Sequence, residues 1–431
     1  MHIPLLDTIK VYFGFLVLFL KSCFFVTKTT QKQKRLFVVT THLPPNSGGG
    51  VFRPFSFLKN AKSNGWGCHA FCFDHRVDNI KAGEYLLNQL EDKRVLHRIK
   101  LSELKPSWKL TPRIDGGLVN SLKMANSILK LGLEVPSVIL ASGPQFNSFI
   151  TGYFLARTFR AKLVLDYRDE WSLCPFEWVE KSKFDQIVER YLCSKADKII
   201  FTTQSHLQNH QSHFGNVAID KRIVLANGYD ESDLASCMVS NTENNYFTLS
   251  FIGVLGDHSL PKEFISALGV LLESNPQLKK VLRVQFIGNK SAQAESILNN
   301  FKFQKNIKII GHVAKIEALN LMSESDALLV LAGKGMKDYI PGKLFDYLSL
   351  KKPILYFGEQ GEASAIVDSL EAGFSISDGD LQGLADCLNK LAQKELVIDE
   401  SKIDMWIKNY TRSHLANKLY KELTGLIEKQ I

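Results

Sequence analysis

Asp338-Tyr339-Ile340-Pro341-Gly342-Lys343-Leu344-Phe345-Asp346-Tyr347-Leu348 is the segment from which the organisation of this chain is most easily read. It follows an apolar run over residues 327–332 and precedes another over residues 353–357, and both runs have the length and composition of buried strands. The loop after the first run contains Gly333 and Gly335, and a short helix is predicted to follow it. A strand, a turn, a helix and a second strand form the repeating unit of an α/β sheet.

The start of this predicted helix suits an anion. Pro341 and Gly342 fit the first turn, whose free N–H groups and positive dipole end favour a phosphate. Lys343 adds a positive charge, and Asp346, one turn further on, can accept hydrogen bonds from sugar hydroxyls. The alternative is an ordinary turn in which Lys343 and Asp346 are solvated, and the rest of the chain must decide between the two.

The composition predicts a globular protein with an anionic partner. A chain of 431 residues is too long for one ordinary core, so two domains are expected. Lys and Arg exceed Asp and Glu by 9, which favours nucleotide phosphates, lipid headgroups or nucleic acid. The basic residues are not interleaved with stacking aromatics, so we expect no nucleic-acid partner. The 7 cysteines are scattered, which favours reduced thiols in the cytosol.

The N-terminus carries an apolar run over residues 11–20 that Lys21 interrupts and residues 23–26 resume. It is barely long enough to span a bilayer, so a short or tilted anchor, a helix lying in the interface and a signal peptide are all open. The signal peptide is disfavoured because no clean cleavage site follows. A buried core helix is the remaining alternative. Basic residues follow the run, which places the body on the cytoplasmic side. Residues 1–30 are therefore predicted to form a membrane-associated apolar helix.

Alternating strands and helices predict two Rossmann-like doubly wound α/β domains, over residues 35–235 and 246–405. A polar segment from Glu231 to Asn245 has the composition of a linker. Residues 406–431 are predicted to form a C-terminal helix that can cross back to the first domain. Ligands of such paired domains bind in the central cleft that the domains face.

The first domain contains two candidate sites. The first predicted strand ends in a loop containing Gly48, Gly49 and Gly50, which allow a ligand to approach the backbone closely, and a helix carrying Arg53 follows. These four residues are the candidate phosphate or acceptor loop, and a plain surface loop is the alternative. The predicted strand over residues 162–166 ends in a second cluster.

That second cluster reads Tyr167-Arg168-Asp169-Glu170-Trp171. It lies at the carboxyl end of a parallel strand, where α/β sheets bind ligands. Arg168 and Asp169 are therefore candidate catalytic or acceptor-binding residues, with a purely structural Arg168–Asp169 pair as the alternative.

Taken in order, the motifs resemble those of the GT-B glycosyltransferases, and most closely the retaining, family 4-like group (glycosyl transferase group 1) of polysaccharide assembly. The segment from Asp166 to Trp171 resembles a D-x-R-D-x-W motif of that group. Asn227-Gly228-Tyr229-Asp230 is similar to its interdomain hinge, and Phe251-Ile252-Gly253 to the first strand of its second domain. Pro341 to Leu348 resembles its P-G-K-x-x-E-Y-L donor-binding segment.

The resemblance assigns roles to several residues. Asp338 and Asp346 correspond to two family glutamates, which lie near the donor sugar and on the nucleotide ribose. Val254 stands where the family often has a diphosphate-binding Arg, so Lys262 and Lys343 are the remaining cations. The implied donor-binding set is Gly253, Lys262, Gly335, Pro341, Gly342, Lys343 and Asp346.

The resemblance implies transfer of a sugar, with retention of the anomeric configuration, from a nucleoside-diphosphate sugar to an acceptor hydroxyl. A lipid-linked or glycan acceptor, as in bacterial lipopolysaccharide or capsule synthesis at the cytoplasmic side of the inner membrane, would suit an attached apolar helix. A sugar-nucleotide epimerase of similar fold, or a non-catalytic sugar-nucleotide-binding partner, are the alternatives.

No metal cofactor is expected, because lysines and helix N-termini can stabilise a leaving diphosphate. Asp378-Gly379-Asp380 matches the D-x-D of metal-using transferases but directly precedes a predicted helix, which favours N-capping. His206, His210 and His213 share one predicted helical face, for which exposure to solvent is favoured over metal binding.

Overall fold

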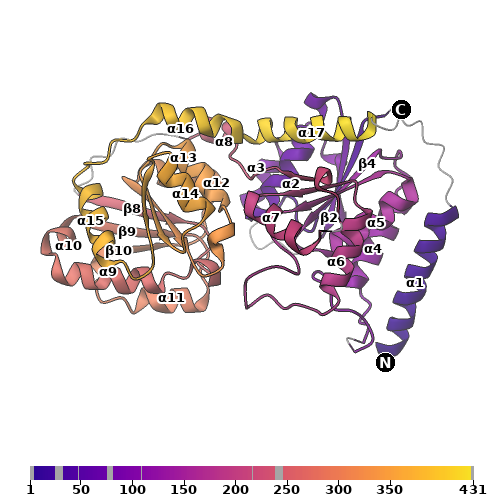
Figure 1. Cartoon of the computed structure of the whole chain (residues 1–431), viewed down its shortest axis with the longest axis horizontal. Coiled ribbons are helices and arrows are strands. Elements are labelled where there is room, and N and C mark those ends of the chain that lie inside the picture. Colours follow the sequence, from indigo (N-terminus) through magenta and orange to yellow (C-terminus); the bar gives the residue numbers. More distant parts are fainter. Residues whose placement is uncertain are drawn as a thin grey trace. The chain divides into compact units, whose positions relative to one another are not determined.

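The computed structural model describes residues 4–24, 33–46, 48–74, 81–107, 109–215, 217–237 and 246–428. The chain divides into two compact units, which we call unit 1 and unit 2. Unit 1 comprises residues 1–226 and 415–431, and unit 2 comprises residues 227–414 (Figure 1). The two parallel-sheet α/β domains predicted from the sequence are thereby confirmed.

Unit 1 is built on a seven-stranded parallel sheet in the order β3-β2-β1-β4-β5-β6-β7. Its strands are β1 (Arg35–Val39), β2 (Gly67–Phe73), β3 (Leu96–Ile99), β4 (Val138–Gly143), β5 (Lys162–Tyr167), β6 (Lys198–Phe201) and β7 (Arg222–Val224). The strand order reverses between β1 and β4. Ligands of open α/β sheets bind beside such a reversal, outside the carboxyl ends of the strands.

Helices cover both faces of this sheet, so β1 is apolar on both sides. Phe37 and Val39 belong to one core and Leu36 and Val38 to the other. The first core lies under α4 (Leu118–Lys130), α5 (Asn147–Phe159), α6 (Asp185–Lys195) and α7 (Gln204–His213). The second lies under α2 (Gly49–Lys59), α3 (Lys81–Leu87) and α17 (Arg412–Glu428). Tyr420 fixes α17 there by donating a hydrogen bond of 2.6 Å to the carbonyl of Phe57.

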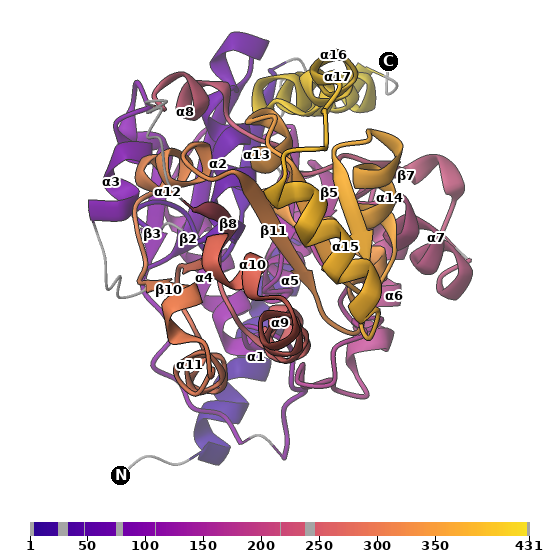
Figure 2. The same ribbon diagram turned by 90° about the vertical axis from the view of Figure 1, so that its left-hand side faces the viewer.

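Unit 2 has a six-stranded parallel sheet in the order β10-β9-β8-β11-β12-β13. Its strands are β8 (Phe247–Ile252), β9 (Leu282–Ile287), β10 (Ile307–Ile310), β11 (Ala327–Ala332), β12 (Ile354–Gly358) and β13 (Gly373–Ile376). One face carries α9 (Lys262–Ser274), α10 (Pro276–Val281), α11 (Ala292–Asn299) and α15 (Leu381–Ala392), the first three of which are seen together in Figure 2. The other carries α12 (Lys315–Ser323), α13 (Gly342–Ser349), α14 (Glu362–Ser369) and α16 (Glu400–Ile407).

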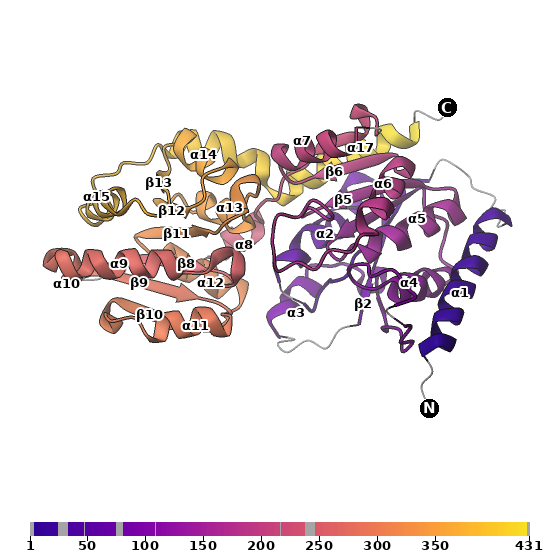
Figure 3. The same cartoon turned by 60° about the horizontal axis from the view of Figure 1, so that its bottom comes forward.

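Helix α1 (Pro4–Phe24) lies along α4 and α5 of unit 1 (Figures 1 and 3). Gly14 makes the close approach to α4 possible, since a Cβ there would lie 2.5 Å from a methyl carbon of Leu122. The buried Asp7 carboxylate accepts a hydrogen bond of 2.9 Å from the Lys105 backbone N–H. Among the helices of the described residues, none combines the length and apolarity needed to cross a bilayer.

Two parts of the chain differ from the sequence prediction. The start of the predicted linker, Glu231–Ala235, is helix α8, capped by the Asp230 carboxylate on the Ser232 N–H at 3.0 Å. Residues 238–245 of that linker lie outside the described residues, as do residues 25–30 of the predicted N-terminal segment. Strand β3 was missed, because its sequence Leu96-His97-Arg98-Ile99 is half polar and lies at the edge of the sheet.

Candidate active site

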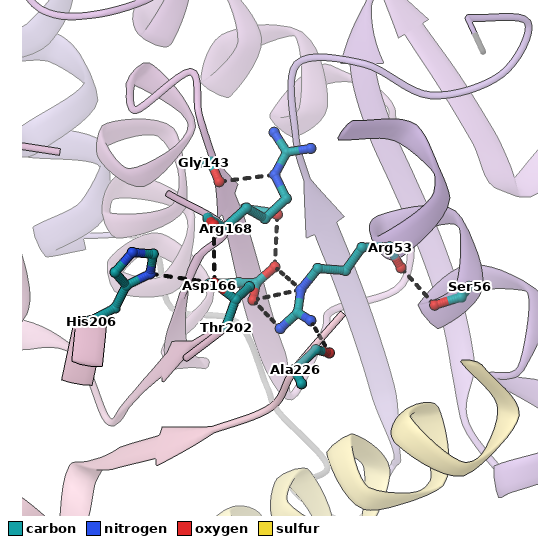
Figure 4. A network of polar contacts seen from close by, with 9 residues as sticks. Arg53, Ser56, Gly143, Asp166, Arg168, Thr202, His206 and Ala226 are labelled. Carbon is teal, nitrogen blue, oxygen red and sulfur yellow. Dashed lines mark hydrogen bonds and ion pairs between the residues drawn. The ribbon is translucent and has the colours of Figure 1, made fainter. Parts of the chain in front are cut away.

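A buried ion pair closes the carboxyl edge of unit 1. The Arg53 guanidinium of α2 binds the Asp166 carboxylate of β5 through Nε at 3.1 and 3.2 Å and Nη2 at 2.8 Å (Figure 4). Asp166 also accepts a hydrogen bond of 2.8 Å from the Ser142 hydroxyl, and Arg53 donates one of 2.7 Å to the Ala226 carbonyl. Asp166 is fully buried and Arg53 is 6% exposed. Arg53, predicted to serve an anionic ligand, thus already has an anionic partner inside unit 1.

Arg168 links three segments at the same edge. Its Nε donates a hydrogen bond of 2.9 Å to the Gly143 carbonyl at the end of β4. Its two terminal nitrogens donate hydrogen bonds to the carbonyls of Gly50 and Pro144. The backbone carbonyl of Arg168 accepts a hydrogen bond of 3.1 Å from the hydroxyl of Thr202, which follows β6. Burial lowers the pKa of Arg168, although Asp169 and Asp166 oppose that shift. Arg168 therefore fixes the relative positions of the loops that follow β1, β4, β5 and β6.

The glycines of the first loop have different surroundings. A Cβ on Gly48 or Gly49 would meet no atom within 4 Å, whereas one on Gly50 would lie 2.5 Å from Nη1 of Arg168. Gly50 is therefore required for the approach of Arg168 to α2. Gly48 is the N-cap residue of α2 and has no side chain with which to cap the first N–H groups of that helix.

Asp169 differs from the carboxylates around it. Glu170 accepts a hydrogen bond of 3.2 Å from the Asn209 amide, and Asp166 is held by Arg53. Among the described residues no hydrogen-bond donor meets the partly buried Asp169 carboxylate. Burial raises its pKa, and the Arg168 charge only partly offsets this. The alternative interpretation, a purely structural Arg168–Asp169 pair, does not hold, because the Arg168 guanidinium is bound to backbone carbonyls instead.

The predicted exposed histidine face was wrong for two of its three members. His206 and His210 are 1% and 2% exposed, while His213 is exposed. The Arg222 guanidinium donates a hydrogen bond of 3.1 Å to Nδ1 of His210, and burial lowers the pKa of His210 to about 3. His206 lies 3.4 Å from the Thr202 hydroxyl, beside the Arg168 carbonyl (Figure 4). No sequence pattern marked Thr202 or His206 as part of this edge.

The carboxyl edge of unit 2 carries a lysine without an acidic partner. The Lys343 ammonium lies 3.5 Å from the centroid of the Phe251 ring, and within the described part of the chain no carboxylate pairs with it. A Cβ on Gly253, whose φ is +134°, would lie 3.4 Å from the Lys343 nitrogen. Burial lowers the pKa of Lys343 to about 7. The predicted donor residues Gly253 and Lys343 are therefore neighbours.

Helix α13 is held against the sheet by a tyrosine in its second turn. The Tyr347 hydroxyl accepts a hydrogen bond of 3.0 Å from the Ile252 N–H of β8 and donates one of 3.3 Å to the Leu329 carbonyl of β11. Pro341 is the N-cap residue and provides no side-chain cap. His258 also lies near Lys343, since burial and then the Lys343 charge lower its pKa.

Asp346 has an internal partner. Its carboxylate accepts a hydrogen bond of 2.5 Å from the ammonium of Lys315, the first residue of α12. The Asp346 side chain is 11% exposed and the Lys315 side chain 12%. Asp233 of α8 belongs to the same group: burial and Asp230 raise its pKa to about 6, and Lys315 opposes the shift. Asp346 is thus neutralised by a lysine that the sequence analysis did not single out.

The other predicted donor residues lie in separate surroundings. Gly335, with φ +92°, begins a 3-10 turn, Met336–Asp338, that ends at the half-buried Asp338. Lys262 lines a hollow of about 310 Å³ with Glu263 and Asp380.

Two further findings concern motifs at the edge of unit 2. Asp380 accepts 2.8 Å from the Gly383 N–H, so the N-capping interpretation of the D-x-D match is confirmed. Lys290, which follows β9, donates hydrogen bonds of 2.6 Å to the carbonyls of Gly288 and Ile310. This role of Lys290 was not predicted. No spacing signal marks Lys290, because its partners are backbone atoms.

Comparisons with known proteins identify the fold. No protein-family model matches the sequence, and no curated protein matches it. Anabaena HepE, solved with UDP and glucose, is similar in structure with a TM-score of 0.59 and 15% identity over 92% of this chain and 98% of that one. The lipopolysaccharide outer core galactosyltransferase WaaB has a TM-score of 0.59 and 12% identity over 92% of this chain and 100% of its own.

A third neighbour is S. aureus TarM, solved as its G117R mutant with fondaparinux, α-GlcNAc-glycerol and UDP. It has a TM-score of 0.63 and 10% identity, covering 92% of this chain and all of TarM. The predicted GT-B glycosyltransferase fold is confirmed by these neighbours.

Proposed function

We propose that the protein is a glycosyltransferase that moves a sugar from a nucleoside-diphosphate sugar to an acceptor hydroxyl. The observation that carries the proposal is the Lys343 ammonium at the carboxyl edge of unit 2 in a GT-B fold. It lies beside Gly253 and has no acidic partner among the described residues. Lys343 is half-buried, and a cation withdrawn from water without a counter-ion is costly unless a ligand supplies the missing charge. A diphosphate is such a ligand.

The leaving diphosphate needs positive charge as the glycosidic bond breaks. Val254 carries no charge, and Lys262 lines a hollow with Glu263 and Asp380 that Lys343 does not line. Lys343 and the uncapped first turn of α13 remain, and they are fixed in place by Tyr347 before the ligand arrives. Preorganised donors of this kind stabilise charge that develops in a transition state. We therefore expect transfer to proceed without a metal cofactor and to persist in EDTA.

We assign the acceptor to the edge of unit 1. Asp169 carries a carboxylate with a raised pKa, which suits a group that hydrogen-bonds or deprotonates an acceptor hydroxyl. Arg168 fixes the loops around it. Asp338 is assigned to the donor sugar and transfer to retention, as the family resemblance implies. The anomeric configuration of the product, measured by NMR, tests the last point.

We further propose an acceptor from bacterial surface polysaccharide synthesis, reached at the cytoplasmic side of the inner membrane. Two neighbours support this by what their names and complexes state: WaaB acts in the lipopolysaccharide outer core, and TarM was solved with α-GlcNAc-glycerol. The exposed apolar side chains of α1 provide a means of attachment to the membrane surface.

The test is calorimetric titration of the full chain with a panel of nucleotide sugars, followed by a search for turnover. Lys343→Met is expected to weaken binding of the preferred donor about 10- to 100-fold, as loss of a charge-assisted contact does. Lys305→Met, which changes an exposed lysine of unit 2, is the matched control and should bind normally. If no nucleotide sugar binds, or if both variants bind equally well, the proposal is wrong. Release of an epimerised sugar would instead identify an epimerase, and tight binding without turnover a non-catalytic partner.

A further inference from the structure

The charged residues on one surface of unit 1 are segregated by sign. Helices α1, α4, α5 and α6 form this surface, which we call the four-helix surface (Figures 1 and 3). Their acidic residues, Asp7, Asp185 and Glu189, are all buried. Their basic residues are all exposed: Lys10, Lys21, Lys123, Lys130, Arg157, Arg190 and Lys195. The outer side of the four helices is therefore uniformly cationic.

The opposite side of unit 1 has no such bias. On α17 the exposed charged residues are Lys418, Lys421, Glu422 and Glu428, and Glu422 pairs with Lys198 at 3.1 Å. None of the large exposed apolar side chains lies on α2, α3 or α17 within their described residues. The segregation is thus a property of the four-helix surface and not of unit 1 as a whole.

The four-helix surface is also apolar in a helical pattern. On α1, the side chains at spacings of three or four residues, Leu5, Ile9, Phe13, Leu16, Leu20 and Phe24, are between 45% and 77% exposed. The inward stripe of the same helix contains Asp7, Thr8, Val11 and Leu18, all buried. Helix α1 therefore packs on unit 1 with one stripe and presents a second apolar stripe outward.

A second apolar group lies on α6. Phe184, its N-cap residue, Ile187 and Tyr191 are 51%, 66% and 48% exposed. The segment before α6 carries the exposed carboxylates of Glu177 and Glu180 and is not part of this group. Exposed aromatic residues next to lysines and arginines are typical of surfaces that enter the headgroup region of a bilayer.

A continuous set of aromatic contacts connects the two groups. Phe15 of α1 packs on Phe154 of α5 at 5.4 Å, and Phe154 packs on Tyr153 at 5.3 Å. Tyr153 in turn packs on Tyr191 of α6 at 5.6 Å and shares a hydrogen bond of 2.7 Å with it. The apolar stripe of α1 and the apolar group of α6 are therefore flanks of one surface.

Arg157 of α5 lies between these groups. Its Nε donates 2.8 Å to the Ser22 hydroxyl, and its guanidinium lies 4.6 Å from the centroid of the Phe19 ring. These contacts hold the C-terminal half of α1 on unit 1. Helix α1 is thus an integral part of the four-helix surface and not a free tether.

We propose that the whole four-helix surface lies on an anionic lipid bilayer, with α1 parallel to the membrane plane and α6 as a second contact. This inference extends the membrane attachment in the proposed function from one helix to a two-part surface. Anionic headgroups complement the exposed lysines and arginines, while the apolar stripes enter the acyl boundary. A second copy of this chain fits less well, because two uniformly cationic surfaces repel each other.

The experiment is sedimentation of the full chain with vesicles of phosphatidylcholine alone or mixed with phosphatidylglycerol at 3:1. Wild-type protein is expected to bind the anionic vesicles at least tenfold more tightly and to lose that preference in high salt. Lys21→Glu with Lys123→Glu should weaken binding to the anionic vesicles at least tenfold. Lys418→Glu with Lys421→Glu, the same charge change on α17, is the matched control and should have little effect.

The second contact is tested by Ile187→Glu, which leaves α1 intact and should also reduce vesicle binding several-fold. Equal binding to both vesicle types, equal loss in the control, or no effect of Ile187→Glu would overturn the two-part surface. A concentration-dependent dimer that Lys21→Glu with Lys123→Glu abolishes would identify a second copy as the partner instead. Nucleotide-sugar affinity, measured without vesicles on the same preparations, should be unchanged in all variants. Failure of vesicle binding and failure of donor binding are therefore separate results.

Discussion

The carboxyl edges of the two sheets differ in whether their cationic side chains already have a partner within the protein. In unit 1 the main charges are already matched: Arg53 binds Asp166, and Arg168 binds backbone carbonyls. In unit 2 the Lys343 ammonium lies over an aromatic ring with no carboxylate bound to it among the described residues. Both edges end parallel sheets of the same kind, so topology alone does not determine which edge receives an anion. The difference depends on which cation has been given an internal partner.

The largest expected effect is on the matched edge. Arg53→Met should destabilise unit 1 by about 3–5 kcal/mol, because it leaves the Asp166 carboxylate buried without its partner. Urea unfolding followed by circular dichroism measures the loss. Arg94→Met, which breaks the exposed Arg94–Asp92 pair, is the control and should destabilise the protein far less. Similar values for both variants would mean that the Arg53–Asp166 pair is not what closes this edge.

The next largest effect concerns the unmatched edge and its dependence on pH. Burial lowers the pKa of Lys343 to about 7, and a bound diphosphate should raise it again by pairing with the ammonium. Binding therefore takes up a proton above pH 7, and donor affinity should fall up to about tenfold per pH unit between pH 7 and 9. His258 does not titrate in this window, because burial and Lys343 lower its pKa.

Lys343→Arg sharpens the same measurement. A guanidinium remains charged across this pH range, so the variant should bind the donor with little dependence on pH. The stability of the free protein should change in the other direction. The unfolded chain holds a proton on this lysine up to about pH 10.5, so stability due to Lys343 rises between pH 7 and 10. A wild-type affinity that stays flat from pH 7 to 9 would exclude Lys343 from the diphosphate site.

A smaller effect is expected where unit 2 does contain a matched pair. Asp346→Asn and Lys315→Met should each weaken nucleotide-sugar binding about tenfold, or about 1.4 kcal/mol, if Lys315 positions Asp346 for the ribose hydroxyls. The double variant should then be no worse than either single variant, because the two residues act as one unit. Lys302→Met, from the exposed Lys302–Glu273 pair, serves as the control. Tighter binding by Lys315→Met would show that the lysine blocks Asp346.

The order of strands and helices could be predicted from the sequence because the central strands are buried on both sides. Runs such as residues 36–39 and 327–332 are continuously apolar, and this is the pattern of parallel strands under two helical layers. Strand β3 and helix α8 were missed, because an edge strand needs few apolar residues and a short capped helix has the composition of a linker.

The site could be predicted only in part. Neighbouring segments, such as the strand ending at Gly253 and the helix beginning at Lys343, were recognisable because each has a local pattern. Internal partners were not recognisable. Arg53 meets Asp166 across 113 residues, and Lys315 meets Asp346 across 31, without a sequence signal that links them. Whether a charge serves a ligand or the fold is decided by such pairings.

The smallest expected effect concerns Asp169, the one carboxylate of the unit 1 edge whose pKa burial raises without a donor among the described residues. A folded-state pKa above the usual 3.8 means that the folded protein binds this proton more tightly than the unfolded chain does. Stability due to Asp169 is then present below pH 3.8 and lost as the pH rises through the folded-state pKa. Asp169→Asn should therefore stabilise the protein at neutral pH by about 0.5–2 kcal/mol, with the gain disappearing in acid.

The same Asp169→Asn variant should transfer sugar more slowly while binding the donor normally, since the donor is assigned to unit 2. Thermal unfolding at two pH values and turnover with a saturating donor measure the two effects side by side. Glu170→Gln, whose parent carboxylate is already bound by Asn209, is the control and should not gain stability in this way. A carboxylate that costs stability and is not needed for turnover would have no reason to be buried at this edge. A stabilised Asp169→Asn variant with full activity would therefore remove Asp169 from the acceptor site.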